Sequence, residues 1–178
     1  MKKKKPGKIE KAYTFLLIKM IGNFSPRRAT NIQFKFFKKY GMKFNGKPNY
    51  ISSKIWFDGT DYSLISIGKE VTMSSYIRVL THDWSPHTIA KAFDLPQEKP
   101  LGILSTVEIG DYSFIGTGTI LMPGCKIGKA CIIGAGTVVR GDIPDYSIYI
   151  GSPGKVVGDS RKYVKSKFPQ FDTPEYKI

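Results

Sequence analysis

Residues 109–144 read, in blocks of six, IGDYSF IGTGTI LMPGCK IGKACI IGAGTV VRGDIP. Each block begins with an aliphatic residue, and glycine follows that residue in four of the six blocks. The fifth position of every block is small or β-branched, and both cysteines, Cys125 and Cys131, fall there. Neither the helical period of 3.6 nor the alternation of a strand generates a period of six over thirty residues. The repeat therefore decides the fold.

A period of six predicts an all-β chain wound into a parallel β-helix. Three blocks close one triangular coil of about eighteen residues, and the coils stack into a prism. The aliphatic residues face the interior, the small residues fill the corners, and glycine is favoured where a Cβ would clash. Cys125 and Cys131 are six residues apart and should lie on adjacent faces, so we expect no disulfide between them.

The same phase appears upstream, at Ile51 and Phe57 and again at Ile67, Met73 and Val79. Ile67 lies 42 residues, or seven blocks, before Ile109, and four extra residues separate the two upstream stretches, around 59–62. Between Val79 and residue 103 the pattern vanishes, which predicts a long loop excursion at about 80–102. Long excursions from a regular fold are usually functional, and this one contains both histidines of the chain.

These patterns divide the chain into three parts. We expect a basic, partly helical segment at 1–44, a β-helix at 45–158, and a C-terminal helix and tail at 159–178. Short helices are expected at 8–21, 30–40 and 159–168, the last opened by Asp159 as N-cap.

The charge is concentrated at the N-terminus. Of the net +14, residues 1–50 hold fourteen Lys/Arg against one acid, Glu10, whereas residues 51–178 hold fourteen Lys/Arg against thirteen acids. Such a segment suits nucleic acid or an anionic membrane. No nucleic-acid-binding signature is present, so we expect no nucleic-acid partner and leave a peripheral membrane contact open. We interpret Lys2–Lys5 as a solvated start. Without a run of about 20 apolar residues, we expect a cytoplasmic protein, or one at the inner face of the membrane.

The chain resembles the hexapeptide-repeat acyltransferase superfamily, in particular the branch with maltose, galactoside and nodulation O-acetyltransferases. The resemblance rests on the six blocks, on the segment THDW at 81–84 and on the closing IGSPGKV at 150–156. It implies a left-handed coil, a homotrimer, and acetyl-CoA bound in the groove between neighbouring prisms. It also implies that the histidine opening the excursion, His82, is the catalytic base.

Further site residues follow from position and from the resemblance. Asp58 and Asp61 could orient His82 or bind a sugar hydroxyl, or they could be ordinary turn aspartates. Trp84 could stack on a sugar ring or pack the loop, and His87 could line the acceptor pocket, although a surface role is the simpler interpretation. The family positions near the cofactor fall on Gly116, Thr117, Ala135, Gly136, Arg140, Pro153 and Lys155.

The resemblance implies acetyl-CoA-dependent O-acetylation of a carbohydrate hydroxyl, in surface polysaccharide biosynthesis, by direct transfer. Imidazole can take the hydroxyl proton at neutral pH. Two alternatives stay open: N-acetylation of a nucleotide-linked amino sugar, and a non-catalytic β-helix scaffold. A serine acetyltransferase is disfavoured, because its helical N-terminal domain exceeds the fifty residues available. Carbonic anhydrases of this fold need three histidines on zinc, and the chain has two, so we expect no metal.

Overall fold

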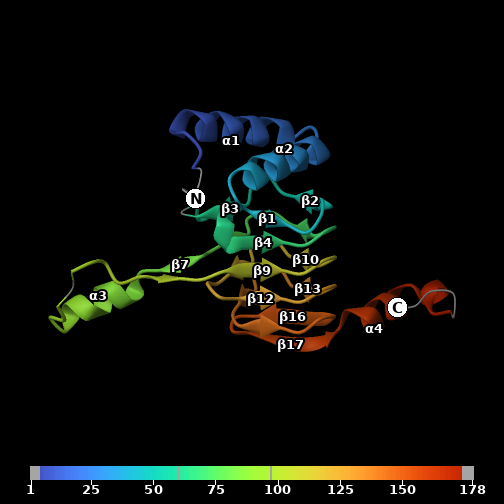
Figure 1. The fold of residues 1–178 in the computed structure, drawn as a ribbon. Coiled ribbons are helices and arrows are strands. Elements are labelled where there is room, and N and C mark those ends of the chain that lie inside the picture. The colour runs from blue at the N-terminus through green and yellow to red at the C-terminus, as the bar shows by residue number, and fades with distance from the viewer. Residues whose placement is uncertain (1–4, 60, 97, 174–178) are drawn as a thin grey trace.

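Three short parallel sheets form a triangular prism, and successive coils of the chain add strands to each sheet in turn (Figure 1). The computed structural model describes residues 5–59, 61–96 and 98–173. A helical hairpin covers one end of the prism, an arm leaves its side, and a further helix follows the last strand (Figure 1).

Each sheet is built from short strands that lie far apart in the sequence. In spatial order, sheet A contains β1 (Lys43–Phe44), β4 (Ile65–Ile67), β9 (Val107–Ile109), β12 (Lys126–Ile127) and β15 (Asp142–Ile143). Sheet B contains β17 (Gly154–Asp159), β16 (Ser147–Gly151), β13 (Ile132–Ile133), β10 (Phe114–Ile115), β5 (Thr72–Met73) and β2 (Tyr50–Ile51). Sheet C contains β14 (Val138–Val139), β11 (Ile120–Leu121), β6 (Arg78–Val79) and β3 (Trp56–Phe57). Within these three sheets, all neighbours are parallel except β16 and β17.

The aliphatic residues stack in columns with the predicted spacing. In sheet A, Ile67 pairs with Ile109 and Ile109 with Ile127, so the 42-residue offset across the excursion is confirmed. In sheet B, Met73 pairs with Ile115 in the same way. All five side chains are at most 3% exposed. The interior of the prism is therefore a continuous apolar core one column wide on each face.

The glycines after the aliphatic residues are required by close stacking of the coils. A Cβ at Gly116 would lie 2.5 Å from the backbone nitrogen of Ala135 in the next coil, well inside contact distance. The backbone turns two residues later instead, where Gly118 and Gly136 have φ of +72° and +67°. The two cysteines are free and buried in corners, as the spacing predicts.

Two positions depart from the regular spacing. The period places Ile143 among the small corner residues, but it pairs with Ile127 in sheet A and is a stacked core residue. The reason is a shortened block, since Ile143 follows Val139 after only four residues. Ile103, where we expect the pattern to resume, is 51% exposed. It pairs with Asp83 outside the prism, which resumes only at Val107.

The helical hairpin of α1 (Lys8–Gly22) and α2 (Pro26–Lys39) closes one end of the prism. Thr30 and Gln33 point down from α2 and bond the backbone of Ile51 on the first strand of sheet B: Ile51 N–H donates to Thr30 Oγ1 (3.1 Å), and Gln33 Nε2 donates to the Ile51 carbonyl (2.8 Å). Phe37 packs its ring against Phe57, 4.7 Å between centroids. Helix α2 therefore satisfies backbone groups at the edge of sheet B and also covers the end of the apolar core.

Helix boundaries differ from the expected ranges for local reasons. α2 begins at Pro26 rather than at residue 30, because proline is favoured in the first helical turn. The last α-helix, α4 (Ser160–Lys167), begins after Asp159, whose carboxylate accepts from the amides of Arg161 and Lys162. A short 3₁₀ helix, η2 (Pro169–Phe171), follows it. β1 already belongs to the prism through its pairing with β4, so the prism begins before residue 45.

The excursion is not a simple loop; it is an arm with its own secondary structure. Two antiparallel strands, β7 (His82–Asp83) and β8 (Ile103–Leu104), form its base, and α3 (Ser85–Ala92) forms its tip (Figure 1). The helix starts at this point because proline lies in its first turn and because Asp83 Oδ1 accepts from the amide of Ser85 at 2.9 Å.

No helix in the described ranges is long and apolar enough to span a membrane. Across the same part of the chain, no group of three or more His, Cys, Asp or Glu side chains is placed to hold a metal ion. The run Lys2–Lys5 lies outside the described residues except for Lys5.

Candidate active site

The candidate active site lies at the corner where sheet C ends and the arm leaves the prism. Phe57 pairs with Val79 in that sheet, so the residues that follow them are stacked one coil apart. Asp58 follows β3, and His82 opens β7 three residues after β6. Two residues 24 positions apart in the sequence therefore meet at one corner.

The side chains of His82 and Asp58 are in direct contact. His82 Nδ1 lies 2.7 Å from Asp58 Oδ2. The Asp58 side chain is 1% exposed and the His82 side chain 25% exposed. The carboxylate is thus buried behind the imidazole, and the imidazole stands between it and solvent.

Thr81 holds the carboxylate in place. Its backbone N–H donates to Asp58 Oδ2 at 2.6 Å, and its hydroxyl lies 2.8 and 2.7 Å from Oδ1 and Oδ2. Burial by itself would raise the pKa of Asp58. The hydrogen bonds from Thr81 and His82 outweigh that effect and hold the pKa below its ordinary value. Asp58 is therefore an anion at neutral pH despite its burial.

This arrangement fixes how the imidazole can act. A carboxylate can only accept, so His82 Nδ1–H donates a hydrogen bond to Asp58, and the basic lone pair resides on Nε2. The tautomer follows from the hydrogen-bond network. An oriented imidazole with an anionic partner on its other nitrogen is the arrangement of a general base.

Asp61, the second carboxylate predicted near His82, has a different position. Its Oδ1 accepts from the amide and the hydroxyl of Ser63, at 3.0 and 2.7 Å. It thereby caps the 3₁₀ helix η1 (Tyr62–Leu64), which forms the insertion between sheets C and A. Of the two carboxylates, Asp58 is the one in contact with the histidine.

Trp84 and His87, the two arm residues expected to bind the acceptor substrate, both contact the segment 101–102 that leads into β8. A Cβ at Gly102 would lie 2.2 Å from the ring of Trp84, so the indole packs on that backbone while 45% of the residue is exposed. Its ring centroid lies 6.1 Å from that of His82. His87 Nδ1 accepts from the amide of Leu101 at 3.4 Å. Trp84 is thus beside the site, and His87 braces the arm.

Five of the residues expected near the cofactor gather at the opposite edge of sheet C, at the corner it shares with sheet B. Gly116 and Thr117 follow β10, and Ala135 and Gly136 follow β13 one coil below. The amide of Gly136 donates to the carbonyl of Thr117 at 2.8 Å. A Cβ at Gly136 would meet no atom within 4 Å. Pro153 continues the corner after β16.

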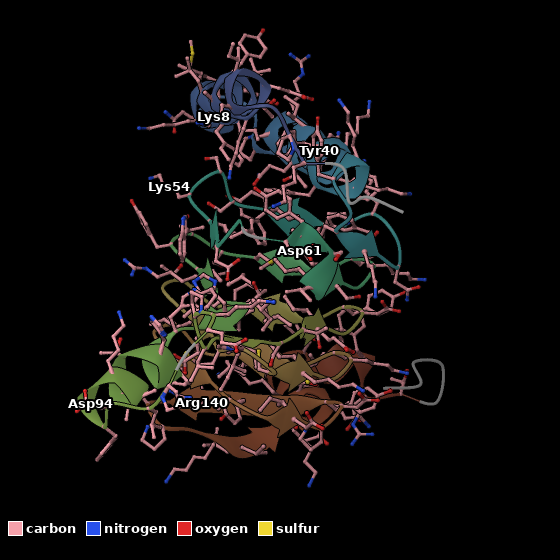
Figure 2. All side chains as sticks on the ribbon, turned by 60° about the vertical axis from the view of Figure 1, so that its left-hand side comes forward. Lys8, Tyr40, Lys54, Asp61, Asp94 and Arg140 are labelled. Atoms are coloured by element: carbon pink, nitrogen blue, oxygen red, sulfur yellow. The ribbon has the colours of Figure 1, made fainter. Side chains whose placement is uncertain are left out.

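The two basic residues expected at the cofactor phosphates do not lie together. Arg140 follows β14, which puts it at the His82 corner. At this corner the hydrogen bonds from the backbone and hydroxyl of Ser85 lower the pKa of Asp83, and the positive charge of Arg140 lowers it further. Lys155 lies on β17, in register with Ile150. Figure 2 shows Arg140 low on the prism, on the side of the arm tip marked by Asp94.

Thr81 is the site residue that the sequence interpretation missed. The signal was present: Phe57 and Val79 are 22 residues apart, which is one coil of three blocks plus the four inserted residues. Counting the insertion places Asp58 directly above residue 80, and the adjacent hydroxyl residue is then within reach. The same count favours Asp58 over Asp61.

Comparison with known proteins agrees with the repeat and the fold. The sequence profile described as bacterial transferase hexapeptide (six repeats) matches residues 106–141. A probable acetyltransferase of Mycobacterium tuberculosis is 38% identical over 96 residues, 54% of this chain and 31% of that protein. Galactoside O-acetyltransferase of Lactococcus lactis is 41% identical over 66 residues, 37% of this chain and 30% of that protein. The chain thus spans about a third of the length of these two relatives.

Among solved structures, a maltose O-acetyltransferase from Clostridium difficile has a TM-score of 0.55 at 20% identity, covering 85% of this chain and 87% of that one. A galactoside acetyltransferase in complex with coenzyme A has a TM-score of 0.53 at 18% identity, covering 96% and 88%. These neighbours imply that the coil is left-handed. The chain is thus similar to bacterial hexapeptide transferases in its repeats, and it shares its fold with the maltose and galactoside acetyltransferases.

Proposed function

We propose that the protein transfers an acetyl group from acetyl-CoA to a hydroxyl of a carbohydrate, with His82 as general base. The observation that carries the proposal is the contact of His82 Nδ1 with the buried Asp58 carboxylate at 2.7 Å. A histidine held in this way, at the mouth of an arm and one quarter exposed, suits proton transfer better than a packing role.

The proposed step is direct. As the acceptor hydroxyl oxygen bonds to the thioester carbonyl carbon, Nε2 of His82 takes its proton, and the Asp58 carboxylate stabilises the imidazolium through Nδ1–H. The carbon–sulfur bond then breaks, and the departing sulfur receives the proton from Nε2. The products are the acetyl ester and free CoA thiol.

Direct transfer is favoured over an acyl-enzyme because the cysteines are poor nucleophiles. Burial raises the pKa of Cys125 to about 12 and also raises that of Cys131. The thiolate is the reactive form, so neither thiol attacks a thioester at neutral pH. Two reduced cysteines also suit a cytoplasmic protein, and we place the reaction there or at the inner face of the membrane.

The corner between sheets B and C suits the acyl donor. Its outer surface carries only small groups at Thr117, Ala135 and Gly136, and the space beside Gly136 is open. A slender pantetheine chain could lie along such a corner. Lys155 at the end of sheet B is exposed and would meet phosphate groups there, whereas Arg140 would act nearer to the acceptor.

A carbohydrate acceptor is supported by the surroundings of His82 and by the relatives. Trp84 offers a partly exposed aromatic ring 6.1 Å from the imidazole, and such rings stack on sugars. Besides the galactoside enzyme, a protein of Escherichia coli provisionally named as a lipopolysaccharide biosynthesis O-acetyltransferase is 28% identical over 96 residues, 52% of this chain and 49% of that protein. We therefore propose a role in surface polysaccharide biosynthesis.

We further propose a homotrimer with each site completed by a neighbouring subunit. The support is the amount of apolar surface that the arm exposes. Seven large side chains of the arm are 44% to 71% exposed: Trp84, Ile89, Phe93, Leu95, Leu101, Ile103 and Leu104. Exposed apolar side chains gathered on one element suit an interface, and adjoining prisms would create a cleft between their faces.

The test is a screen of acetyl-CoA against sugars, nucleotide sugars and lipid-linked glycans, followed by thiol release. On the best acceptor, His82→Ala should lower kcat by about 10²- to 10⁴-fold, with the same oligomeric state and near-unchanged CoA affinity. The matched control is His87→Ala, which should keep kcat within a few-fold. A folded His82→Ala enzyme with wild-type kcat would refute the mechanism, and absence of thiol release with every acceptor would favour the scaffold alternative.

A further inference from the structure

Helix α1 exposes an apolar stripe that the fold does not use. Ile9, Tyr13, Leu16 and Met20 follow one another at spacings of four, three and four residues, which places them on one helix face. They are 87%, 66%, 58% and 59% exposed. Phe24, just after the helix, is 91% exposed. The stripe therefore points into solvent along the whole length of α1.

The opposite face of α1 carries the packing. Ile18 is 3% exposed, and the ring of Phe15 lies 5.6 Å from that of Phe36 and 6.2 Å from that of Phe37 on α2. Since these residues hold α1 against α2, the stripe can be altered without removing a core contact.

The surface around the stripe is strongly cationic. The hairpin also exposes basic side chains: Lys8, Lys19, Arg28, Lys35, Lys38 and Lys39. Glu10 is the one acidic residue in the first fifty, and it pairs with Lys39 at 2.7 Å. The hairpin thus combines an apolar stripe with an almost uncompensated positive charge. Figure 2 shows side chains that end in nitrogen atoms extending outward from the helices at the end of the molecule where Lys8 and Tyr40 are labelled.

We infer that the outer face of the α1–α2 hairpin docks on an anionic lipid bilayer, with the stripe buried among the headgroups and the basic side chains on the lipid phosphates. Interfacial helices bind in this way, by apolar area together with attraction to anionic lipids. A second copy of the chain is a poor occupant, because two such faces would bring like charges together. Nucleic acid would match the charge but leave the apolar stripe in water.

The hairpin that carries the docking face also contacts the corner that carries the base, through the opposite face of α1. Lys11 of α1 extends under the hairpin, with its Nζ 5.8 Å from the ring centroid of Tyr62. The same atom lies 3.0 Å from where a Cβ at Gly59 would be, and Gly59 directly follows Asp58. A bilayer on the outer face of the hairpin would therefore be separated from the His82 corner by the layer of the hairpin helices. If the proposed function holds, the acceptor is then a glycan attached to a lipid.

The test is co-sedimentation of the full chain with vesicles of phosphatidylcholine alone or with roughly 30% phosphatidylglycerol. Binding should occur only with the anionic vesicles and should weaken as salt rises. Leu16→Ser with Met20→Ser should weaken it at least tenfold. Arg28→Ser with Lys35→Ser should weaken it by about 25-fold, since each cation near the surface contributes about fivefold.

The matched control is Tyr163→Ser with Phe168→Ser on the C-terminal helix, where the side chains are 46% and 48% exposed and lysines are also adjacent. This variant should bind as the wild type does. Vesicle binding needs no catalysis, so its outcome is independent of the acetyl-transfer proposal. Equal binding to neutral vesicles, no binding to either kind, or loss in the control equal to that in the stripe variant would overturn the inference. So would tight binding of duplex DNA without vesicle binding.

Discussion

Replacing Asp58 by asparagine removes the negative charge beside His82 and keeps the shape of the side chain at position 58. The carboxylate oxygen Oδ2 accepts both from the Thr81 amide (2.6 Å) and from His82 Nδ1 (2.7 Å). A backbone N–H can only donate, so the amide of the new side chain must turn its oxygen toward it. An unpaired buried N–H would cost about 1–3 kcal/mol. The oxygen therefore still faces His82, and the imidazole keeps its tautomer.

The expected loss is the difference between a charged and a neutral acceptor. Hydrogen bonds to charged groups contribute about 1.5–3 kcal/mol and neutral ones about 0.5–1.5. When His82 becomes an imidazolium in the transition state, Asp58→Asn should therefore lose about 1–2 kcal/mol, or roughly 5- to 30-fold in kcat. Thiol release at saturating acetyl-CoA and acceptor measures it, and the KM for acetyl-CoA should stay unchanged.

Asp61→Asn is the matched control, because Asp61 bonds Ser63 in the same insertion, and its kcat should stay within about twofold. An unchanged kcat in Asp58→Asn would refute the role of the carboxylate. A loss near 10⁴-fold, the size seen when a base is held in the wrong tautomer, would refute the argument from Thr81 about the orientation of the amide.

Three further outcomes are expected. Because the pKa of Asp58 is lowered in the folded state, its carboxylate stabilises the fold at neutral pH, and this contribution is lost as pH falls below about 4. The free energy of unfolding, followed by circular dichroism, should therefore fall less steeply with decreasing pH for Asp58→Asn than for the wild type. Gly116→Ala places a Cβ 2.5 Å from the next coil and should cost about 1–3 kcal/mol by thermal unfolding, whereas Gly158→Ala, with its nearest atom at 3.4 Å, should change stability by less than about 0.5 kcal/mol. Sedimentation should give a trimer, and a monomer of full activity would contradict the shared site.

The sequence predicted the prism well because the repeat and the core are the same feature. Each aliphatic residue recurs where a column requires it, so the register of Ile67 with Ile109 could be counted in advance. Where spacing is irregular, as at Ile143, the count assigned the wrong role. The arm was harder, since the strands at its base pair with each other and not with the prism. Its helix depends on the local hydrogen bond that the Ser85 amide donates to Asp83, and the six-residue period does not predict this bond.

The site was predictable in part for a similar reason. His82 is marked by its place at the mouth of the excursion, but its partner depends on how an insertion shifts the stacking. Asp58 and Asp61 differ by three positions, and only the coil count separates them. The buried bonds from Thr81 depend on side-chain directions that follow once the corner is built. The placement of Arg140 away from Lys155 likewise depends on which corner each block ends at.

The two ends of the prism have a consequence for solubility. Every coil offers the next one a row of unpaired backbone groups, so a bare prism would be a segment of an endless fibre, able to add further copies at either end. One end is stopped by the side chains of Thr30 and Gln33 on Ile51. The other is stopped by β17, which runs antiparallel to β16 and so offers an incoming parallel coil the wrong direction. The same chain thus forms coils that could stack without limit and the capping elements that prevent further copies from adding at either end.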